Sequence, residues 1–397
     1  MAGAGVGGLT AAVALARRGW RVTLLERRDG QEDIGAGLQL APNASAILRD
    51  LGLLPALLES GLAPDAVRIR RARDGAELAR LPLTDAEARW GAPYLAVHRA
   101  DLIAALRGAA LAEANVSFHP QTALAGFDQT PAGVQAACLR GPMRLSFSAD
   151  CLIGADGMRS FVRARDAALR GRPDDLPKRA HYVAWRTLVP ADRVAADMRL
   201  PESSLWLGPG AHLVHYPLRR GALINVVAVV DAKQRLDDKT DLWSQAGDAA
   251  WIAARFARWA LPIRALIAAA ADWRTWPLVE RAARPSWSNG RIALLGDAAH
   301  AMLPFLAQGA AQAIEDAAAL AAHLAPDADV AAALAAYSGA RAHRAARVQE
   351  ESRRQARRYH LGAPASLVRD MVLRGLGPAR LTARYDWLYG ARAPDPK

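Results

Sequence analysis

The stretch Gly3-Ala-Gly-Val-Gly-Gly8 stands at the start of the chain, and the apolar segment Arg21-Val-Thr-Leu-Leu-Glu26 follows it. Glycines at this spacing let the backbone approach a pyrophosphate at a helix N terminus. A carboxylate about 20 residues further on accepts hydrogen bonds from a ribose. The spacing therefore predicts a nucleotide-binding βαβ unit, with contacts from Gly3, Gly5, Gly8 and Glu26.

Two further glycine-bearing loops lie far along the chain, Gly154-Ala-Asp-Gly-Met-Arg-Ser160 and Gly296-Asp-Ala-Ala-His300. One glycine fingerprint alone is weak evidence, but three such loops together suit one large anionic nucleotide and favour FAD over NAD. The sequence has no second fingerprint that would mark a separate nicotinamide domain. This argues against the reductases that bind two dinucleotides.

The chain resembles the single-component flavin-dependent aromatic hydroxylases, which include salicylate hydroxylase, 3-hydroxybenzoate 6-hydroxylase and 6-hydroxynicotinate 3-monooxygenase. The resemblance extends from Gly3 to Tyr385-Asp-Trp-Leu-Tyr-Gly390. It is carried by Cys151-Leu-Ile-Gly-Ala-Asp-Gly-Met-Arg-Ser-Phe-Val-Arg163 and Met302-Leu-Pro-Phe-Leu-Ala-Gln-Gly-Ala-Ala-Gln-Ala-Ile-Glu-Asp316. It implies an α/β fold like that of para-hydroxybenzoate hydroxylase, with a Rossmann-like FAD-binding domain, an inserted antiparallel-sheet substrate domain and C-terminal helices.

Hydrophobic periodicity and turn residues predict how these parts follow one another. The FAD-binding domain is expected to be discontinuous, over residues 1–66, 92–165 and 281–325. The substrate domain is expected over 67–91 and 166–280, and a helical region over 326–397. Segments 67–72 and 77–83 read as a hairpin around Asp74-Gly75, and residues 243–271 read as helical with a break at Pro262.

The resemblance also implies which other residues contact the cofactor. Asp297 corresponds to the aspartate that binds the ribityl chain, Pro304 lies beside the reactive edge of the isoalloxazine, and Asp156 lies in a turn used around FAD and the pyridine nucleotide. As a turn aspartate, Asp156 also suits hydrogen bonds to its own backbone. The remaining expected cofactor contacts are Arg27, Gly37, Arg99, Gly296, Gln308, Gly309 and Ala310.

The candidate base lies in the segment His212-Leu-Val-His-Tyr216. Because side chains alternate along a strand, His212 and Tyr216 share one face and His215 takes the other. The pair on one face resembles the active site of the 6-hydroxynicotinate enzyme, so we expect His212 to remove a phenol proton and Tyr216 to orient the ring, with His215 as the rival base. Ser203 stands where that enzyme is expected to have a cysteine.

The resemblance implies hydroxylation of a small phenolic carboxylate, salicylate- or hydroxybenzoate-like, by FAD, NADH or NADPH, and O2 through a flavin C4a-hydroperoxide. Two alternatives stay open: a monooxygenase for a bulkier quinone precursor or antibiotic, and a non-catalytic flavin-binding redox module. The formal charge of +12 is spread over scattered basic residues, so nucleic acid is not an expected partner.

The two cysteines, Cys138 and Cys151, lack the spacing of metal ligands, and no apolar run reaches the roughly 20 residues of a membrane span. A soluble, cytoplasmic monomer or homodimer without a metal is expected.

The first glycine loop normally follows a buried strand of about 5–6 residues, but only Met1 and Ala2 precede it. Either the natural start lies further upstream or the chain has been shortened. We expect the sequence as printed to fold poorly, because the neighbouring strands would keep unpaired backbone groups. A chain extended by about half a dozen apolar residues should fold well.

Overall fold

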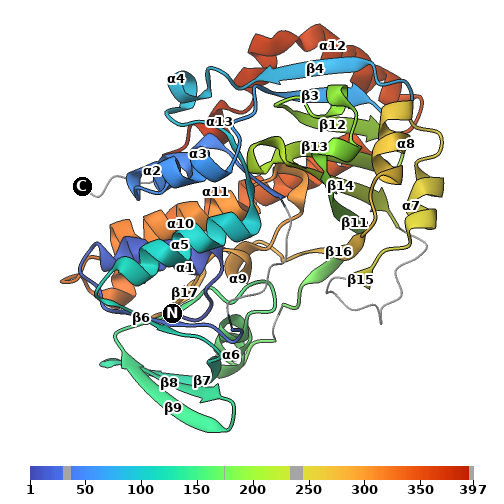
Figure 1. Ribbon diagram of the computed structural model, residues 1–397. Helices are drawn as coiled ribbons and strands as arrows, with labels where there is room; N and C mark the ends of the chain where they lie inside the picture. Colours follow the sequence, from blue (N-terminus) through green and yellow to red (C-terminus); the bar gives the residue numbers. More distant parts are fainter. Residues whose placement is uncertain (30–36, 174, 233–244, 393–397) are drawn as a thin grey trace.

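A mainly parallel sheet carries the N-terminal glycine loop in the computed structural model, which describes residues 1–29, 37–173, 175–232 and 245–392 (Figure 1). Ala2 pairs in parallel with both Leu25 and Gly154, and so joins the two halves of this sheet. Its N–H donates to the carbonyl of Ile153 at 2.9 Å. The strands, in order across the sheet, are β6 (Val116–His119), β1 (Val22–Leu25), β10 (Leu152–Gly154), β18 (Ile292–Leu294) and the antiparallel β17 (Ser288–Asn289).

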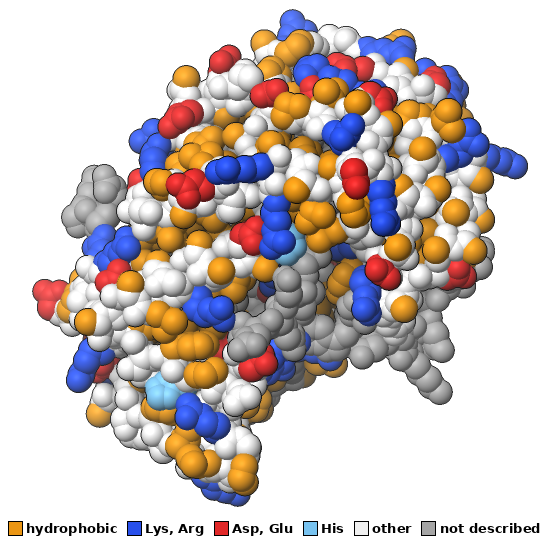
Figure 2. Space-filling view, in the orientation of Figure 1, with side chains coloured by type: hydrophobic (Ala, Val, Ile, Leu, Met, Phe, Trp, Pro, Cys, Tyr) orange, Lys and Arg blue, Asp and Glu red, His pale blue; other side chains and the backbone are white. Residues whose placement is uncertain are grey.

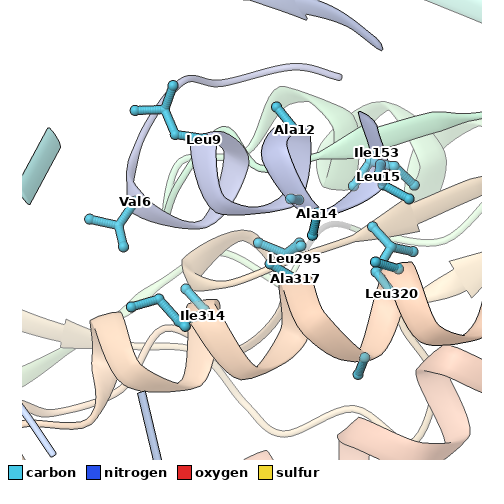
Figure 3. Packing of buried hydrophobic residues seen from close by; sticks show 14 of the residues in the cluster. Val6, Leu9, Ala12, Ala14, Leu15, Ile153, Leu295, Ile314, Ala317 and Leu320 are labelled. Carbon is cyan, nitrogen blue, oxygen red and sulfur yellow. The ribbon is translucent and has the colours of Figure 1, made fainter. Parts of the chain in front are cut away.

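Helix α1 (Val6–Ala16) leaves the glycine loop and is buried along its whole length. It packs against α10 (Gly309–His323), and Figure 3 shows Ala14 of α1 facing Ala317 of α10, with Leu295 beside them. The two helices approach closely because Gly7 has no side chain; a Cβ there would lie 3.1 Å from the Cβ of Ala313 in α10 and 2.4 Å from the side chain of Leu295. A helix that is apolar all round, as α1 is, belongs in the core of such a protein.

The second large sheet has eight strands in the order β15-β16-β11-β14-β13-β12-β3-β4. The hairpin predicted around Asp74-Gly75 is confirmed as β3 and β4, and β3 joins the sheet by parallel pairing with β12. The strands are β3 (Ala66–Arg71), β4 (Glu77–Pro82), β11 (Lys178–Pro190), β12 (Ser203–Gly208), β13 (Ala211–Leu218), β14 (Leu223–Asp231), β15 (Gln245–Ala246) and β16 (Arg274–Glu280).

The two faces of this sheet have different neighbours. One face packs in a single apolar cluster with α7 (Ala249–Arg255) and α8 (Leu261–Ala268). The other contacts the 3-10 turn η4 (Pro304–Leu306), the long helix α11 (Val330–Tyr359), and α12 (Ala365–Ala383) with the short α13 (Asp386–Tyr389). In Figure 1, α12 lies along the hairpin β3–β4, while α7 and α8 lie at the opposite side of the sheet.

The prediction for residues 243–271 is partly wrong. Its first two residues lie outside the described chain, and Gln245 and Ala246 form a strand. The predicted break is present as the interval between α7 and α8, with Pro262 in the first turn of α8. Proline suits the first helical turn because its missing N–H has no partner to lose there.

No helix of the described residues is long and apolar enough to cross a membrane. The remaining elements include two smaller sheets, β2-β5 and β7-β8-β9. They are α2 (Pro42–Asp50), α3 (Leu54–Ser60), α4 (Ala86–Trp90), α5 (Arg99–Ala112), α6 (Phe161–Leu169), α9 (Asp297–His300), β2 (Gly37–Leu40), β5 (Leu95–His98), β7 (Ala123–Thr130), β8 (Gly133–Arg140), β9 (Met143–Ala149), η1 (Ala191–Arg193), η2 (Ala196–Met198) and η3 (Arg219–Gly221).

Candidate active site

The glycine loop has a separate physical requirement at each predicted position. Gly3 adopts φ of +103°, and a Cβ there would lie 2.3 Å from the carbonyl oxygen of Ala155. At Gly8 a Cβ would lie 2.0 Å from the carbonyl oxygen of Gly3, so the loop and helix approach closely. A Cβ on Gly5 would meet nothing within 4 Å, so this backbone faces open space. The loop is therefore shaped for a ligand that approaches the backbone at Gly5.

The end of α1 suits an anion. Its N-cap is Gly5, no side chain caps it, and its first turn contains no acidic residue. The uncapped N–H groups of its first turn and the helix dipole therefore favour a phosphate. Glu26, at the end of β1, accepts hydrogen bonds from the backbone N–H of Ala4 at 2.9 Å and of Arg28 at 3.0 Å. These residues fit the pyrophosphate and ribose of FAD, whereas the predicted contact Arg27 lies exposed beside Glu26.

The second glycine motif is tied to α6. One carboxylate oxygen of Asp156 accepts from the Ser160 hydroxyl at 2.5 Å and the other from the Val162 N–H at 3.1 Å. Burial raises the pKa of Asp156, although these hydrogen bonds oppose the shift. Ser160 in turn caps α6 by accepting from the Arg163 N–H. Asp156 thus stabilises the turn that packs against Gly3, and its predicted cofactor contact stays a prediction.

The third motif follows β18, which lies next to β10 in the sheet. Gly296 has φ of +63° and donates its N–H to Asp316 at 2.9 Å. Asp297 is exposed at the first position of α9, with no hydrogen bond among the described residues. An unpartnered carboxylate at a strand end suits the hydroxyl groups of a ribityl chain. The neighbouring His300 faces inward, with Nε2 2.6 Å from Asp316 Oδ2.

The N terminus of α10 is built from Gln308, Gly309 and Ala310. Gln308 is buried; its Oε1 accepts from Asn43 Nδ2 at 3.0 Å, while its Nε2 has no partner among the described residues. Gly309 has open space where a Cβ would stand. Pro304 begins the preceding turn η4. This segment offers backbone N–H donors next to the cavity described below.

Two predicted cofactor residues lie between the sheets. Arg99 is exposed at the first position of α5, where His98 Nδ1 accepts the N–H of Ala100. Gly37 donates its N–H to Asn225 Oδ1 at 2.9 Å, and a Cβ on Gly37 would lie 2.7 Å from the hydroxyl oxygen of Tyr216. Gly37 therefore lets β2 lie directly against the eight-stranded sheet.

His212 lines a cavity of about 90 Å³ between the eight-stranded sheet, η4 and the C-terminal helices. Its Nδ1 lies 2.8 Å from His360 Nε2, and its ring packs 5.3 Å from Phe305 and 5.2 Å from Tyr359. Burial, and then His360, hold the pKa of His212 well below 6.5. The cavity is lined by Gln39, Val67, Leu81, Tyr94, Ser203, Leu205, His212, Val214, Pro304, Phe305, Leu306, Ala307, Tyr359, Tyr385 and Tyr389.

Tyr216 and His215 do not line this cavity. Tyr216 is buried beneath Gly37, and burial raises the pKa of its hydroxyl. His215 lies on the opposite face of β13, with its ring 6.3 Å from that of Trp206, and neither of its ring nitrogens has a hydrogen-bond partner in the described part of the chain. Burial, and then Arg70, lower the pKa of His215 to about 3. The structure thus separates the two histidines.

Several residues of the site have no motif in the sequence. Tyr94 donates to Gln39 Oε1 at 3.0 Å, and Gln39 Nε2 donates to Ser203 at 2.6 Å, which forms a polar wall of the cavity. His360 comes from the far end of α11. These residues come from different segments of the chain, so no short motif contains them. Only their residue types could have suggested a role in the site.

Comparison with known proteins decides the family. A profile described as an FAD binding domain matches residues 1–352. The chain belongs to this FAD binding domain family. The predicted resemblance and FAD as cofactor are confirmed.

Similar members of the FAD binding domain family cover nearly the whole chain. The 3-amino-4-hydroxybenzoate 2-monooxygenase of Streptomyces platensis is 38% identical over 98% of this chain and 95% of its own length. The 3-hydroxybenzoate 6-hydroxylase of Klebsiella oxytoca is 34% identical over the same shares. The solved salicylate hydroxylase substrate complex superposes with a TM-score of 0.83 at 25% identity, over 99% of this chain and 95% of that one. These matches confirm the predicted fold class.

Proposed function

We propose that this protein is an FAD-dependent monooxygenase that hydroxylates a small phenolic aromatic carboxylate with NADH or NADPH and O2. The named activities of its relatives support this reaction. Bound FAD supplies the electron transfer and the activation of dioxygen. The glycine loop, Glu26, Asp297 and the N terminus of α10 would hold it. We also propose that the FAD-binding domain is discontinuous, with the substrate domain inserted in it, and that the protein is a monomer or a homodimer.

His212 carries the chemical part of the proposal. Its Nδ1 is engaged with His360, so Nε2 is the ring nitrogen left for the cavity. Because its lowered pKa keeps the imidazole neutral at pH 7, Nε2 has a lone pair for the phenol proton. The resulting phenolate is the electron-rich ring that aromatic hydroxylation requires.

The cavity favours a small substrate over a bulky one. Its volume of about 90 Å³ is below the roughly 150 Å³ of an engineered cavity that binds benzene. A single aromatic ring therefore needs the lining side chains to move apart, and a quinone precursor or antibiotic would need a much larger opening. Ser203 accepts a hydrogen bond from Gln39, so its own O–H remains to donate to a substrate carboxylate.

The test uses the FAD-loaded enzyme with hydroxybenzoates, salicylate and 6-hydroxynicotinate, and measures aromatic-stimulated NADH oxidation with product analysis. His212→Gln should lower kcat by about 10²–10⁴-fold for the substrate that wild type hydroxylates. His215→Gln, a buried histidine of the same strand, is the matched control and should remain active. If His215→Gln abolished turnover and His212→Gln did not, the assignment of the base would be wrong.

A further inference from the structure

Helix α12 presents a row of large apolar side chains to solvent, here called the α12 stripe. Its members are between 50% and 69% exposed: Leu367, Val368, Met371 and Val372. Spacings of three and four residues place all four on one face of the helix. On any other element of the described chain, at most two such side chains are exposed. A contiguous group of this kind marks an interaction surface, whereas scattered ones do not.

The opposite face of α12 fixes the helix to the protein. Leu373 and Leu376 pack in the apolar cluster that contains Leu78 and Leu81 of hairpin strand β4. Asp370, on the same inner face, is 5% exposed and accepts a hydrogen bond from Arg369 at 2.7 Å. In Figure 1, α12 forms an outer edge of the molecule beside the hairpin, away from the N-terminal sheet. The stripe therefore lies on an outward face of a firmly packed helix.

The charges that α12 exposes are all positive. Arg374 and Arg380 are exposed within the helix, and Arg384 is exposed at its C-cap. The helix is described over its whole length, and its single acidic residue, Asp370, is buried. An exposed apolar row with only arginines beside it is the pattern of a basic amphipathic helix.

The adjoining end of α11 adds to this positive charge. Arg357 and Arg358 are exposed there, and the carbonyl of Arg358 accepts a hydrogen bond from Arg369 Nη1 at 3.2 Å. That bond places the end of α11 directly beside the first turns of α12. The carboxylates of Glu350 and Glu351 lie 3.9 and 3.8 Å from these two arginines and two helical turns back along α11.

The acids of the neighbouring hairpin are already paired. Asp74 binds Arg71 at 2.6 Å, and Glu77 binds Arg68 at 3.2 Å. A second copy of the chain placed on the stripe by two-fold symmetry would bring the same arginines toward one another, and α12 has no exposed acid to pair with them. The arginines around the stripe instead complement a surface that carries many negative charges.

We propose that the α12 stripe docks the protein on an anionic lipid bilayer. The four apolar side chains enter the boundary between headgroups and acyl chains, while the arginines of α12 and of the end of α11 contact lipid phosphates. The helix lies in the plane of the surface, in keeping with the finding that no helix of the described residues can cross a membrane. The stripe is distinct from the cavity and the glycine loops, so this docking is independent of the proposed reaction.

The test sediments the FAD-loaded enzyme with vesicles of phosphatidylglycerol and, separately, of phosphatidylcholine. The enzyme should bind the phosphatidylglycerol vesicles, and added salt should release it. The double variant Met371→Glu with Val372→Glu should weaken this binding by about tenfold or more, because two inserted side chains become charged. Leu261→Glu, at a 67% exposed position of α8, is the matched control and should bind like the wild type.

A second variant tests the part played by charge. Arg374→Gln and Arg380→Gln should each weaken binding to phosphatidylglycerol by about fivefold. Unfolding temperature and flavin content should match the wild type in every variant, because all the altered side chains are exposed. Binding to phosphatidylcholine as strong as to phosphatidylglycerol would contradict recognition of anionic lipid.

Two further results would overturn the proposal. The first is a folded, FAD-bound wild type that does not sediment with phosphatidylglycerol vesicles at low salt. The second is a homodimer, measured by analytical ultracentrifugation without lipid, that the Met371→Glu and Val372→Glu double variant dissociates. That result would assign the stripe to a second copy of the chain.

Discussion

Gly5 and Gly8 are three residues apart, yet they serve different purposes in the loop. Gly8 has its Cβ position filled by the carbonyl oxygen of Gly3, while Gly5 faces open space with an ordinary φ of −76°. The requirement at Gly8 concerns packing within the protein, whereas the requirement at Gly5 concerns a ligand. The two glycines should therefore respond differently to the same substitution.

Gly5→Ala should fold normally and bind FAD about tenfold or more weakly, a loss of about 1.4 kcal/mol. Gly8→Ala should instead destabilise the protein by about 1–3 kcal/mol, because the added methyl overpacks the loop. Flavin titration and thermal unfolding of both variants check this. Equal unfolding temperatures for the two variants would contradict the distinction.

Ser203 lines the cavity, and its hydroxyl oxygen accepts a hydrogen bond from Gln39. Ser203→Ala should raise KM for a phenolic carboxylate by about 10-fold with kcat little changed, since it removes a bond to the substrate and not to the reacting oxygen. Steady-state kinetics with a phenol that lacks the carboxylate provide the comparison. An equal rise in KM for both compounds would rule out carboxylate recognition by this residue.

At the scale of elements, α10 and α11 are joined by buried charges. Arg341 binds Glu315 at 2.5 Å and Asp316 at 2.8 Å, and Arg344 binds Glu315 at 2.6 Å. Breaking such a pair leaves a buried charge without a partner, which costs more than the intact pair contributes. The helices that support the third glycine motif therefore depend on Arg341.

Arg341→Leu should lower the free energy of unfolding by about 3–5 kcal/mol. Arg354→Leu is the control on the same helix; its ion pairs are exposed and lie within α11, so the unfolding midpoint should stay unchanged. Urea unfolding at pH 7 measures both. Matching midpoints for Arg341→Leu and wild type would show that the buried charges do not hold the helices together.

The same cluster predicts sensitivity to acid. Burial alone would raise the pKa of Asp316, but His300 and Arg341 outweigh it and lower the pKa to about 2. Because this lies below the roughly 3.9 of an unfolded aspartate, its contribution to stability is present above about pH 4 and is lost as pH falls toward 2. Unfolding free energies at pH 7, 4 and 3 should show most of the loss below pH 4. A loss complete by pH 5 would point to other groups.

For the whole molecule, the site lies where two sheets meet. Figure 2 shows lysine and arginine side chains scattered among acidic and apolar ones on the visible face, without one basic patch. Gly37 of β2 lies against Tyr216 and Asn225 of the eight-stranded sheet, while the three glycine motifs come from residues 3–8, 154–160 and 296–300. A ligand that contacts all three glycine motifs should therefore stabilise segments distant in the sequence.

FAD at about 100 times its dissociation constant should stabilise the folded protein by about 2.7 kcal/mol. Thermal unfolding across a series of FAD concentrations tests this, with Gly5→Ala as the variant in which the rise should need more FAD. An unfolding temperature independent of FAD in wild type would contradict binding at the glycine loops.

The conformation of the three glycine loops was largely predictable from local sequence. Gly3, Gly8 and Gly296 are required by close approach or positive φ, which are local backbone constraints that leave a glycine signature. Strand alternation likewise separated His212 from His215. The cavity was not predictable in the same way, because Tyr216 shares a face with His212 and yet lies under Gly37, outside the cavity lining.

The sequence by itself determined the three glycine loops, the hairpin β3–β4 and the face on which His212 lies, since each depends on neighbours a few residues apart. Only the tertiary structure brought His360 to within 2.8 Å of His212, 148 residues away, and built the polar wall from Tyr94, Gln39 and Ser203. Such contacts depend on how helices pack against a sheet. That packing is set by the whole core and leaves no short pattern in the chain.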